Sequence, residues 1–316
     1  MEKKHKVVVT RYFPGEEGRE RLDKFCKTDF NDQIPPLAPD VLASKIKDAD
    51  AIISMGDKIT KEMIDTAANL KIIADMWGGR QIDQDACKEK NIKICGSGFD
   101  MTWISDVEAE HGFMMMAALG RALFKADKFV RSGKWEHSEQ SNKLFLGQGL
   151  YERKLGIVGG FRRTGEQVVR RAKAMFMDVM YYDTERSEKM EALGAVYTPF
   201  DEMIKTSDYI FIITNGIEGY VFDKPQFDIM NPKAYLVNVS SGKCINEKEL
   251  VKALTDGRLA GAGLDKTENQ PAHEPELDKM ENVILTPHSD GALLDERGAI
   301  YNALIDQCFN TLGIVG

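Results

Sequence analysis

The sequence predicts an α/β protein built on parallel sheets, and two observations support this. Short apolar runs alternate with amphipathic stretches along almost the whole chain, as expected where each strand is followed by a helix. This rhythm occurs twice, and a long apolar segment separates the two occurrences. Alternation of this kind predicts parallel strands with helices on both faces of each sheet.

The composition excludes several classes of protein. The chain has 316 residues, of which 43% are hydrophobic and 29% charged, the mix of a folded protein with room for two domains. Its formal net charge of −8 argues against nucleic acid or an anionic membrane as a partner. No apolar run approaches the ~20 residues that span a bilayer, and no signal-peptide pattern follows the first residues. Five dispersed cysteines without a CxxC pair are typical of reduced thiols, so we expect a cytoplasmic protein without a metal site.

Ten apolar runs predict buried strands. In the first half they are KVVVT at 6–10, AIISM at 51–55, LKIIA at 70–74 and IKIC at 92–95. In the second half they are 154–159, 178–183, 209–214, 234–239, 259–265 and 282–287. The segments between them read as helices and turns, without low-complexity sequence.

The segment from Ser105 to Trp135 separates the two halves. Ser105 is a plausible helix cap with Glu108 three residues on. From Phe113 to Leu119 the segment is apolar nearly all round, so a helix here must bury more than one face. It is either an interdomain core helix or a helix that also packs against a second subunit; the second interpretation predicts a homodimer through helix 105–133.

A phosphate-binding turn is predicted where the strand 154–159 ends. Gly159 closes the strand, and Gly165 opens the next helix, where a missing side chain lets helix and strand approach. Backbone N–H groups at such a turn can hold a pyrophosphate. Asp183, after the next strand, is placed to accept the ribose hydroxyls of a dinucleotide.

This turn is irregular, because Phe161, Arg162 and Arg163 occupy the stretch that normally has a second bare glycine. Arg162 would either crowd the pyrophosphate or bind it. The two arginines leave NADP open, but Asp183 would repel a 2′-phosphate and favours NAD. A Rossmann scaffold that no longer binds a nucleotide is the remaining alternative.

With these segments in view, the chain resembles the D-isomer-specific 2-hydroxyacid dehydrogenases over essentially its whole length. The stretches that carry the resemblance are LGIVGGFRRTGEQVVRRAKAMFMDVMYYD, NPKAYLVNVSSGKCINEKELVKAL, GRLAGAGLDKTENQPAHEPEL and NVILTPHSDGA. VEAEHGFMMMAA is similar to the dimerisation helix of that family.

The resemblance implies two Rossmann-like domains with parallel sheets and a homodimer. A flavodoxin-like substrate (catalytic) domain would comprise residues 1–103 and 292–316, and an NAD-binding Rossmann domain, residues 104–291, would be inserted into it. The implied cofactor is NAD, and the implied cofactor-binding residues are Gly159, Gly160, Phe161, Arg162, Arg163, Thr164, Asp183, Thr214, Asn215 and Asp265.

Three side chains perform the chemistry of that family, and only one is present here. The family's histidine, which exchanges a proton with the substrate oxygen, is matched by His288 in the motif TPH. The family's carboxylate partner of this histidine is matched by Gln270, at the usual spacing from His288. The family's substrate-gripping arginine is matched by Ser241 in Asn-Val-Ser-Ser-Gly.

These replacements change the expected chemistry. Gln270 brings no negative charge, so it favours the imidazolium less than a glutamate would. Ser241 cannot make the bidentate contact with a carboxylate that an arginine makes. We therefore expect simple 2-oxo acids to be handled badly.

The substrate side of the resemblance also departs from the family. The family's glycine-rich loop is matched here by Met76-Trp77-Gly78-Gly79-Arg80, which is one residue shorter than in the family and contains a tryptophan. Arg80 is either a replacement for the missing arginine or a solvated surface residue. The stretch Gly98–Asp106 is about four residues longer than in the family and brings Trp103, as a packed lid or as an apolar wall for a bulkier substrate.

The sequence thus predicts an NAD-dependent oxidoreductase with altered specificity, which transfers hydride to or from a bulkier or non-standard carbonyl or hydroxy compound with His288 as acid and base. The alternative is a catalytically silent, NAD-binding member of the family that acts as a sensor or interaction protein.

Overall fold

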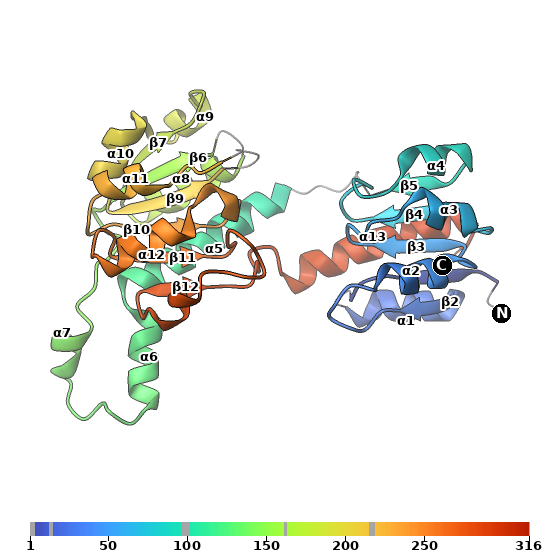
Figure 1. Ribbon diagram of the computed structural model, residues 1–316, viewed down its shortest axis with the longest axis horizontal. Coiled ribbons are helices and arrows are strands. Elements are labelled where there is room, and N and C mark those ends of the chain that lie inside the picture. The colour runs from blue at the N-terminus through green and yellow to red at the C-terminus, as the bar shows by residue number, and fades with distance from the viewer. Residues whose placement is uncertain (1–3, 13–14, 97–101, 161–162, 215–218, 316) are drawn as a thin grey trace. The chain divides into compact units, whose positions relative to one another are not determined.

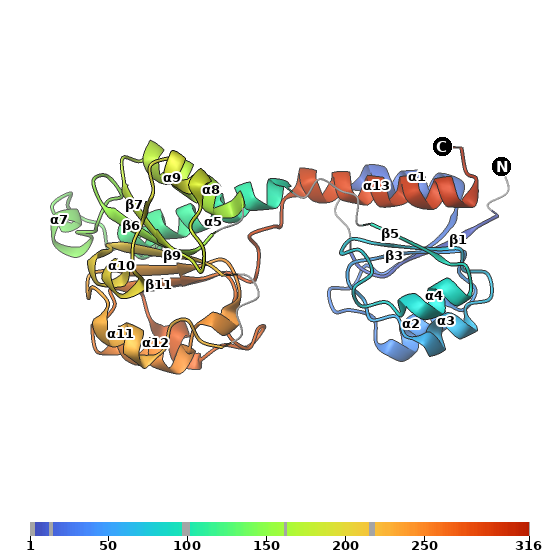
Figure 2. The same ribbon diagram turned by 90° about the horizontal axis from the view of Figure 1, so that it is seen from above.

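The computed structural model describes residues 4–12, 15–96, 102–160, 163–214 and 219–315. The chain divides into two compact units: unit 1 contains residues 1–100 and 292–316, and unit 2 contains residues 101–291. Each unit is a parallel sheet with helices on both faces, so the predicted α/β class is confirmed (Figure 1, Figure 2).

Unit 1 has a five-stranded sheet in the order β2-β1-β3-β4-β5, and each neighbouring pair is parallel. Its strands are β1 (Lys6–Val9), β2 (Lys27–Phe30), β3 (Ala51–Ser54), β4 (Ile72–Asp75) and β5 (Lys93–Cys95). Its helices are α1 (Glu16–Phe25), α2 (Pro39–Ile46), α3 (Lys61–Thr66), α4 (Gln84–Glu89) and α13 (Leu294–Leu312). Helices α1 and α13 cover one face and α2, α3 and α4 the other (Figure 2).

The sequence of each strand in unit 1 matches its depth. β3 and β4 are buried at every residue, which explains their continuous apolar runs. The predicted runs correspond to β1, β3, β4 and β5. β2 was missed because its sequence, KTDF, is polar and only partly buried at the sheet edge.

Unit 2 has a seven-stranded sheet in the order β12-β11-β10-β9-β6-β7-β8, again parallel throughout. Its strands are β6 (Lys154–Gly159), β7 (Asp178–Tyr182), β8 (Val196–Tyr197), β9 (Tyr209–Ile213), β10 (Tyr235–Asn238), β11 (Gly261–Leu264) and β12 (Val283–Leu285). Its α-helices are α5 (Thr102–Gly120), α6 (Leu123–Arg131), α7 (Gln140–Leu144), α8 (Arg163–Ala174), α9 (Glu188–Ala192), α10 (Phe200–Thr206), α11 (Lys224–Ile229) and α12 (Glu247–Thr255). Two 3-10 helices, η1 (Gly242–Cys244) and η2 (Pro275–Lys279), follow β10 and β11.

Two apolar cores lie on opposite faces of this sheet. Side chains of α5 and α8 form one core with β6, β7 and β9, and α10, α11 and α12 form the other (Figure 2). Helix α5 packs on α8 as well as on β10 and β11, which explains why it is apolar nearly all round. At Gly112 there is no room for a side chain, because a Cβ would lie 2.1 Å from the Phe211 ring.

The single long helix predicted from Ser105 is wrong in its bounds. Helix α5 begins earlier, at Thr102, and ends at Gly120, and α6 starts only at Leu123. The break lies at Ala122, whose φ of 47° is in the left-handed region that a helix cannot contain. The chain turns there because Gly120 packs tightly: its C=O accepts from the Gln148 N–H at 2.6 Å, and a Cβ would lie 2.1 Å from the Tyr209 hydroxyl.

Strand order in unit 2 reverses between β6 and β9. From β6 the chain builds β7 and β8 on one side, and from β9 it builds the remaining strands on the other. In open α/β sheets, ligands bind at the carboxyl ends of the strands where the order reverses. Here those ends are Gly159 and Ile213. Among the helices of the described ranges, none has both the length and the apolarity that a membrane crossing requires.

Candidate active site

The turn after β6 has the geometry of a dinucleotide-binding turn. Gly159 and Gly160 have φ of 81° and 100°, in a region of backbone conformation that residues other than glycine rarely adopt. A Cβ on Gly165 would lie 2.0 Å from the Gly160 carbonyl oxygen, so the first turn of α8 presses directly on the turn. The first N–H groups of a helix lack intrahelical acceptors and attract anions. These residues therefore fit the pyrophosphate of a dinucleotide.

The other predicted cofactor residues are less uniform. Asp183 follows β7 directly and is partly exposed, as an acid that contacts a ribose must be. Arg163 is the first residue of α8 and donates to Asp106 at 3.1 Å. Phe161, Arg162 and Asn215 lie outside the described residues.

Two of these predicted residues point their hydroxyl groups into the protein. The Thr164 hydroxyl donates to Glu108 at 3.0 Å, across to α5. The Thr214 hydroxyl lies 3.4 Å from that of Ser240, and the Thr214 N–H donates to the same oxygen at 2.9 Å. Both residues are nearly fully buried, so their hydroxyl groups are not placed to serve a ligand.

Ser241 belongs to a tight loop after β10. Its carbonyl oxygen accepts from the Asn238 amide at 3.1 Å and from the Cys244 thiol at 2.8 Å. Gly242 lets this loop approach the chain after β11, because a Cβ there would lie 2.0 Å from the Thr267 carbonyl oxygen. Burial raises the pKa of Cys244 to about 11, so this thiol is inert at neutral pH.

Gln270 and His288 line one cavity of about 460 Å³ at the carboxyl edge of the unit 2 sheet. The structure thus brings together two of the three residues matched to the family's chemistry. The His288 side chain is 51% exposed. Its backbone N–H donates to the carbonyl oxygens of Asp265 and Thr286, at 2.8 and 3.0 Å, and its φ is 52°. This left-handed conformation fixes the direction in which the imidazole leaves the loop.

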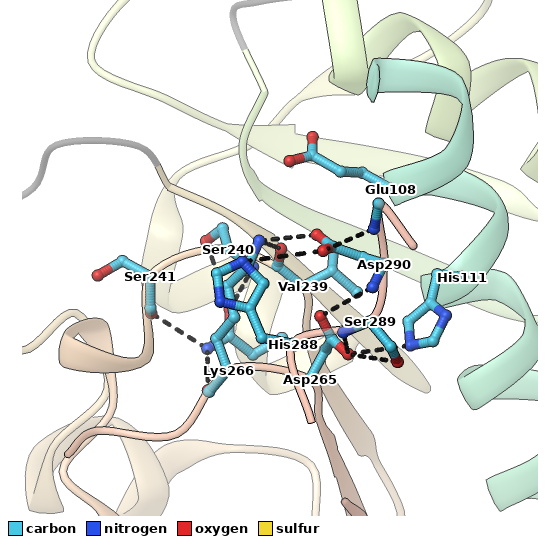
Figure 3. Close-up of polar contacts among 12 residues, drawn as sticks. Glu108, His111, Val239, Ser240, Ser241, Asp265, Lys266, His288, Ser289 and Asp290 are labelled. Atoms are coloured by element: carbon cyan, nitrogen blue, oxygen red, sulfur yellow. Dashed lines mark hydrogen bonds and ion pairs between the residues drawn. The ribbon is translucent and has the colours of Figure 1, made fainter. Parts of the chain in front are cut away.

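The buried carboxylate of Asp265 holds this loop (Figure 3). One oxygen accepts from the Thr286 hydroxyl at 2.6 Å and the Ser289 N–H at 2.9 Å, and it lies 3.2 Å from Nε2 of His111 on α5. Burial alone would raise the pKa of Asp265, but the donors from His111, Thr286 and Ser289 together hold that pKa well below its usual value. Asp265 was predicted as a cofactor residue; in the structure its carboxylate accepts from donors of its own unit.

A second carboxylate, Asp290, lies beside His288. Its Oδ1 is 3.9 Å from Nε2 of His288, and its Oδ2 accepts from the Lys266 ammonium at 2.7 Å (Figure 3). The same ammonium donates to the Val239 carbonyl oxygen at 2.6 Å. Nearby, burial raises the pKa of Glu108, against the opposing effects of the Lys266 charge and the Thr164 hydroxyl.

In unit 1, the predicted substrate loop is closed on an internal carboxylate. Asp75 is fully buried, and its Oδ2 accepts from the N–H groups of Trp77 and Gly79 at 3.0 and 2.8 Å. The Gly78 N–H donates to the Asp75 carbonyl oxygen at 3.0 Å. The N–H groups of Trp77, Gly78 and Gly79 are therefore occupied within the loop.

The remaining predicted substrate residues differ in exposure. Trp77 is 42% exposed, and Arg80 is exposed and makes no ion pair with the other described residues. Trp103 lies in the first turn of α5 and is partly buried. Of the stretch 98–106 that contains it, residues 98–101 lie outside the described residues.

The sequence reasoning missed five charged or titratable residues of these two sites: Asp75, Glu108, His111, Lys266 and Asp290. A signal for three of them was present. Asp75 ends β4, Lys266 follows the predicted strand that ends in Asp265, and Asp290 comes two residues after His288. Charged residues directly after buried parallel strands gather at one edge of the sheet.

Comparison with known proteins matches both units. The family profile "D-isomer specific 2-hydroxyacid dehydrogenase, NAD binding domain" matches residues 113–289, and the catalytic domain profile of the same family matches residues 7–102. A glyoxylate reductase from Pyrococcus furiosus is 35% identical over 94% of this chain and 89% of its own. A glyoxylate reductase from Thermococcus litoralis is 36% identical over 93% of this chain and 89% of its own.

Solved structures agree with these matches. A protein from Polaromonas sp. JS6 66, assigned to the D-isomer-specific 2-hydroxyacid dehydrogenases, superposes with a TM-score of 0.85 at 28% identity, over 98% of this chain and 96% of its own. D-lactate dehydrogenase from Escherichia coli, at 21% identity, has the same fold with a TM-score of 0.80, over 98% of each chain.

The Asp265 contacts predict a pH-dependent loss of stability in Asp265→Asn. Because the folded-state pKa is depressed, the ionised carboxylate stabilises the fold above the unfolded-state value of about 3.9, and this contribution fades as the pH falls below it. At pH 7 we expect the variant to melt about 5 °C below the wild type, and the gap to narrow below about pH 4. Thermal unfolding followed by circular dichroism across this pH range measures the difference in melting temperature.

Asp256→Asn, at an exposed partner of Arg258, is the control and should barely change the melting temperature. A gap that stays constant with pH would contradict the role given to the Asp265 charge.

Proposed function

We propose a substrate and an acid–base residue for a chain that belongs to the D-isomer-specific 2-hydroxyacid dehydrogenase family. As a member of that family, the chain is an NAD-dependent oxidoreductase that acts on a hydroxyl or carbonyl carbon. We propose that its substrate is a compound other than a simple 2-oxo acid and that His288 is the acid and base. The observation that carries the proposal is the place of His288: half exposed on a cavity of about 460 Å³ that Gln270 also lines. The serine in the loop after β10, where the resemblance expects an arginine, supports the change of substrate.

Reduction of a carbonyl group to a hydroxyl group requires one hydride at the carbon and one proton at the oxygen. NADH, held at the turn after β6, would supply the hydride for the carbonyl carbon. The protonated His288 imidazole gives its proton to the carbonyl oxygen as the C–O double bond becomes a single bond, and in the reverse direction the neutral imidazole takes that proton back. The fixed backbone of His288 limits where its ring can reach, so the loop positions the acid before substrate binds.

The cofactor would lie along the turn after β6. The backbone of Gly159 and Gly160 and the first turn of α8, with Arg163 and Thr164, would hold the pyrophosphate. Asp183 would accept from the adenosine ribose, which favours NAD over NADP. Thr214 would contribute through its backbone; Phe161, Arg162 and Asn215 remain candidates from sequence alone.

The polar groups around the two loops support a substrate without a carboxylate at the reacting carbon. Ser241 provides a neutral hydroxyl where an arginine would provide a bidentate cation. The N–H groups of Trp77 and Gly79 are occupied by Asp75. The substrate-binding candidates that remain are Trp77, Gly78, Gly79, Arg80 and Trp103, of which two are large and aromatic and one is cationic.

A second candidate function is glyoxylate reduction, because relatives at 35–36% identity bear that name. It requires a cation to hold the substrate carboxylate, and Arg80 is the exposed arginine available in unit 1. The catalytically silent alternative is disfavoured by the family membership of both units and by the retained His288.

We also propose a homodimer formed through α5 and α6. A groove of about 1050 Å³ lies along these helices and α7, lined mostly by apolar side chains. Met114, Leu123, Phe124, Val130 and Trp135 are between 48% and 61% exposed there. An apolar surface this continuous is typical of a protein interface, and a second copy of the same groove would cover it.

The acid–base role predicts that His288→Ala lowers kcat by about 10²- to 10⁴-fold without weakening NADH binding. The substrate for this test is the best-reduced compound from a panel of aldehydes, ketones and 2-oxo acids. Quenching of tryptophan emission measures NADH affinity in the same samples. His137→Ala, at an exposed histidine of unit 2, is the control. Undiminished turnover by His288→Ala would refute the mechanism.

The substrate proposal predicts a gain of activity in Ser241→Arg. A restored arginine can grip a carboxylate bidentately, so kcat/KM for glyoxylate should rise at least about tenfold over the wild type. Ser241→Lys is the matched control, since a lysine adds the charge without the fork geometry and should give a smaller rise. If the wild type is already an efficient glyoxylate reductase and the arginine lowers that activity, the second candidate function replaces the first.

The dimer proposal predicts that the paired change Phe124→Asp and Val130→Asp converts a dimer to a monomer, because two buried charges without partners oppose association. Light scattering after gel filtration measures the molar mass at micromolar concentration. Val196→Asp, at an exposed apolar residue of β8, should leave the dimer intact. A monomeric wild type would exclude this interface.

A further inference from the structure

Asp290, two residues after His288, places its carboxylate close to the imidazole of His288. Asp290 Oδ1 is 3.9 Å from the imidazole Nε2, too long for a hydrogen bond but within the range of direct charge interaction. The Asp290 side chain is buried, and that of His288 is half exposed. Figure 3 shows the ring facing this carboxylate across the loop that carries both residues.

The orientation of the Asp290 carboxylate is fixed from both sides. Its Oδ1 accepts from the Gly291 N–H at 2.9 Å, and its Oδ2 from the Lys266 ammonium at 2.7 Å. Lys266 is in turn fixed, because its ammonium also donates to the Val239 carbonyl oxygen at 2.6 Å. A carboxylate held this way can act on a neighbouring imidazole without moving.

We infer that Asp290, anchored by Lys266, is the positioning carboxylate of His288: it orients the imidazole and favours its protonated form, which the neutral Gln270 cannot do. This inference rests on the proposed function in that His288 is taken as the acid and base of the reaction. Lys266 has a second role, because its positive charge limits how strongly Asp290 favours the imidazolium.

The other ionisable groups near His288 do not replace Asp290 in this role. The Asp265 carboxylate is already engaged by His111, Thr286 and the loop N–H groups. Glu108, on α5, accepts from Thr164, and His273, which lines the same cavity as His288, is paired with Asp278 at 2.8 Å. The groups to consider in a titration of His288 are therefore Glu108, His111, Asp265, Lys266, His273 and Asp290.

Removing the charge of Asp290 and removing that of Lys266 should change the stability of the His288 imidazolium in opposite directions. A purely structural role of the two residues would not predict this. Asp290→Asn removes the negative charge and leaves Lys266, so the imidazolium becomes less stable. Lys266→Met removes the positive charge and leaves Asp290, so the imidazolium becomes more stable. Damage to the loop would move both variants in the same direction or in neither.

The experiment follows the titration of His288 by NMR in the full chain labelled with ¹³C-histidine. The five histidines give few signals, and His288→Ala assigns the relevant one. The midpoint should fall by about half a pH unit or more in Asp290→Asn and rise in Lys266→Met. Adding Gln270→Glu to Asp290→Asn should restore much of the fall, because a carboxylate then lines the same cavity. The acid–base limb of kcat/KM should shift with the midpoint.

Asp278→Asn is the matched control, since it removes the same charge from the neighbouring pair with His273 and should move the His273 midpoint but not that of His288. Unchanged midpoints, or shifts of the same sign in the two test variants, would overturn the inference. Should Asp290→Asn fail to fold, Lys266→Met alone tests the inference, because a fall or no change in its His288 midpoint would also overturn it. If His288→Ala retains turnover while the midpoints move as expected, the acid–base role fails and the coupling of Asp290 to His288 stands.

Discussion

The carboxyl edge of the unit 2 sheet depends on one buried carboxylate, that of Asp265. It receives donors from α5, from the end of β12 and from the loop that follows. A buried carboxylate is tolerable only when such donors compensate for the lost water. The same contacts hold the loop in the shape that gives His288 its left-handed backbone. The side chain that we propose as acid and base is therefore placed by an interaction that need not touch substrate itself.

A second charge arrangement rests on this one. The Asp290 N–H donates to Asp265 at 3.3 Å, so the residue that faces His288 is oriented by the same buried acid. Lys266 then compensates Asp290 and ties it to the carbonyl oxygen of Val239, next to the loop with Ser241. Buried ion pairs contribute little net stability but specify geometry when each charge has further partners. Both charges have such partners, the Gly291 N–H for Asp290 and the Val239 carbonyl oxygen for Lys266.

The sequence predicted the repeating strands well because buried parallel strands are continuous apolar runs, and it failed where that signal was absent. The polar edge strand β2 was missed, and the helix break at Ala122 was missed because it arises from the packing of Gly120 against Tyr209, far along the chain. In the site, the glycines of the turn were identified from the order of strand, turn and helix, and His288 from the family resemblance. Lys266 and Asp290 were not, because their significance lies in a contact between loops 24 residues apart. Asp75 was missed although it is a charged residue at the end of a buried strand, because the contact of its carboxylate with the backbone of its own loop is seen only in the structure.

The internal carboxylates also bear on what the protein accepts. In unit 1 the Asp75 carboxylate takes two N–H groups of its own loop, and in unit 2 the Lys266 ammonium is taken by Asp290. In each unit a donor group able to hold an anionic substrate is already bound to an anion supplied by the chain. Unless Arg80 binds its carboxylate, a 2-oxo acid would have to displace these contacts or remain unpaired, and either course costs it binding free energy. A neutral carbonyl compound meets no such cost, because it needs only a proton donor at its oxygen, the role proposed for His288, and apolar surface for the rest. The loss of the arginine at 241 is therefore consistent with a wider redistribution of charge, in which contacts within the chain have replaced contacts with substrate.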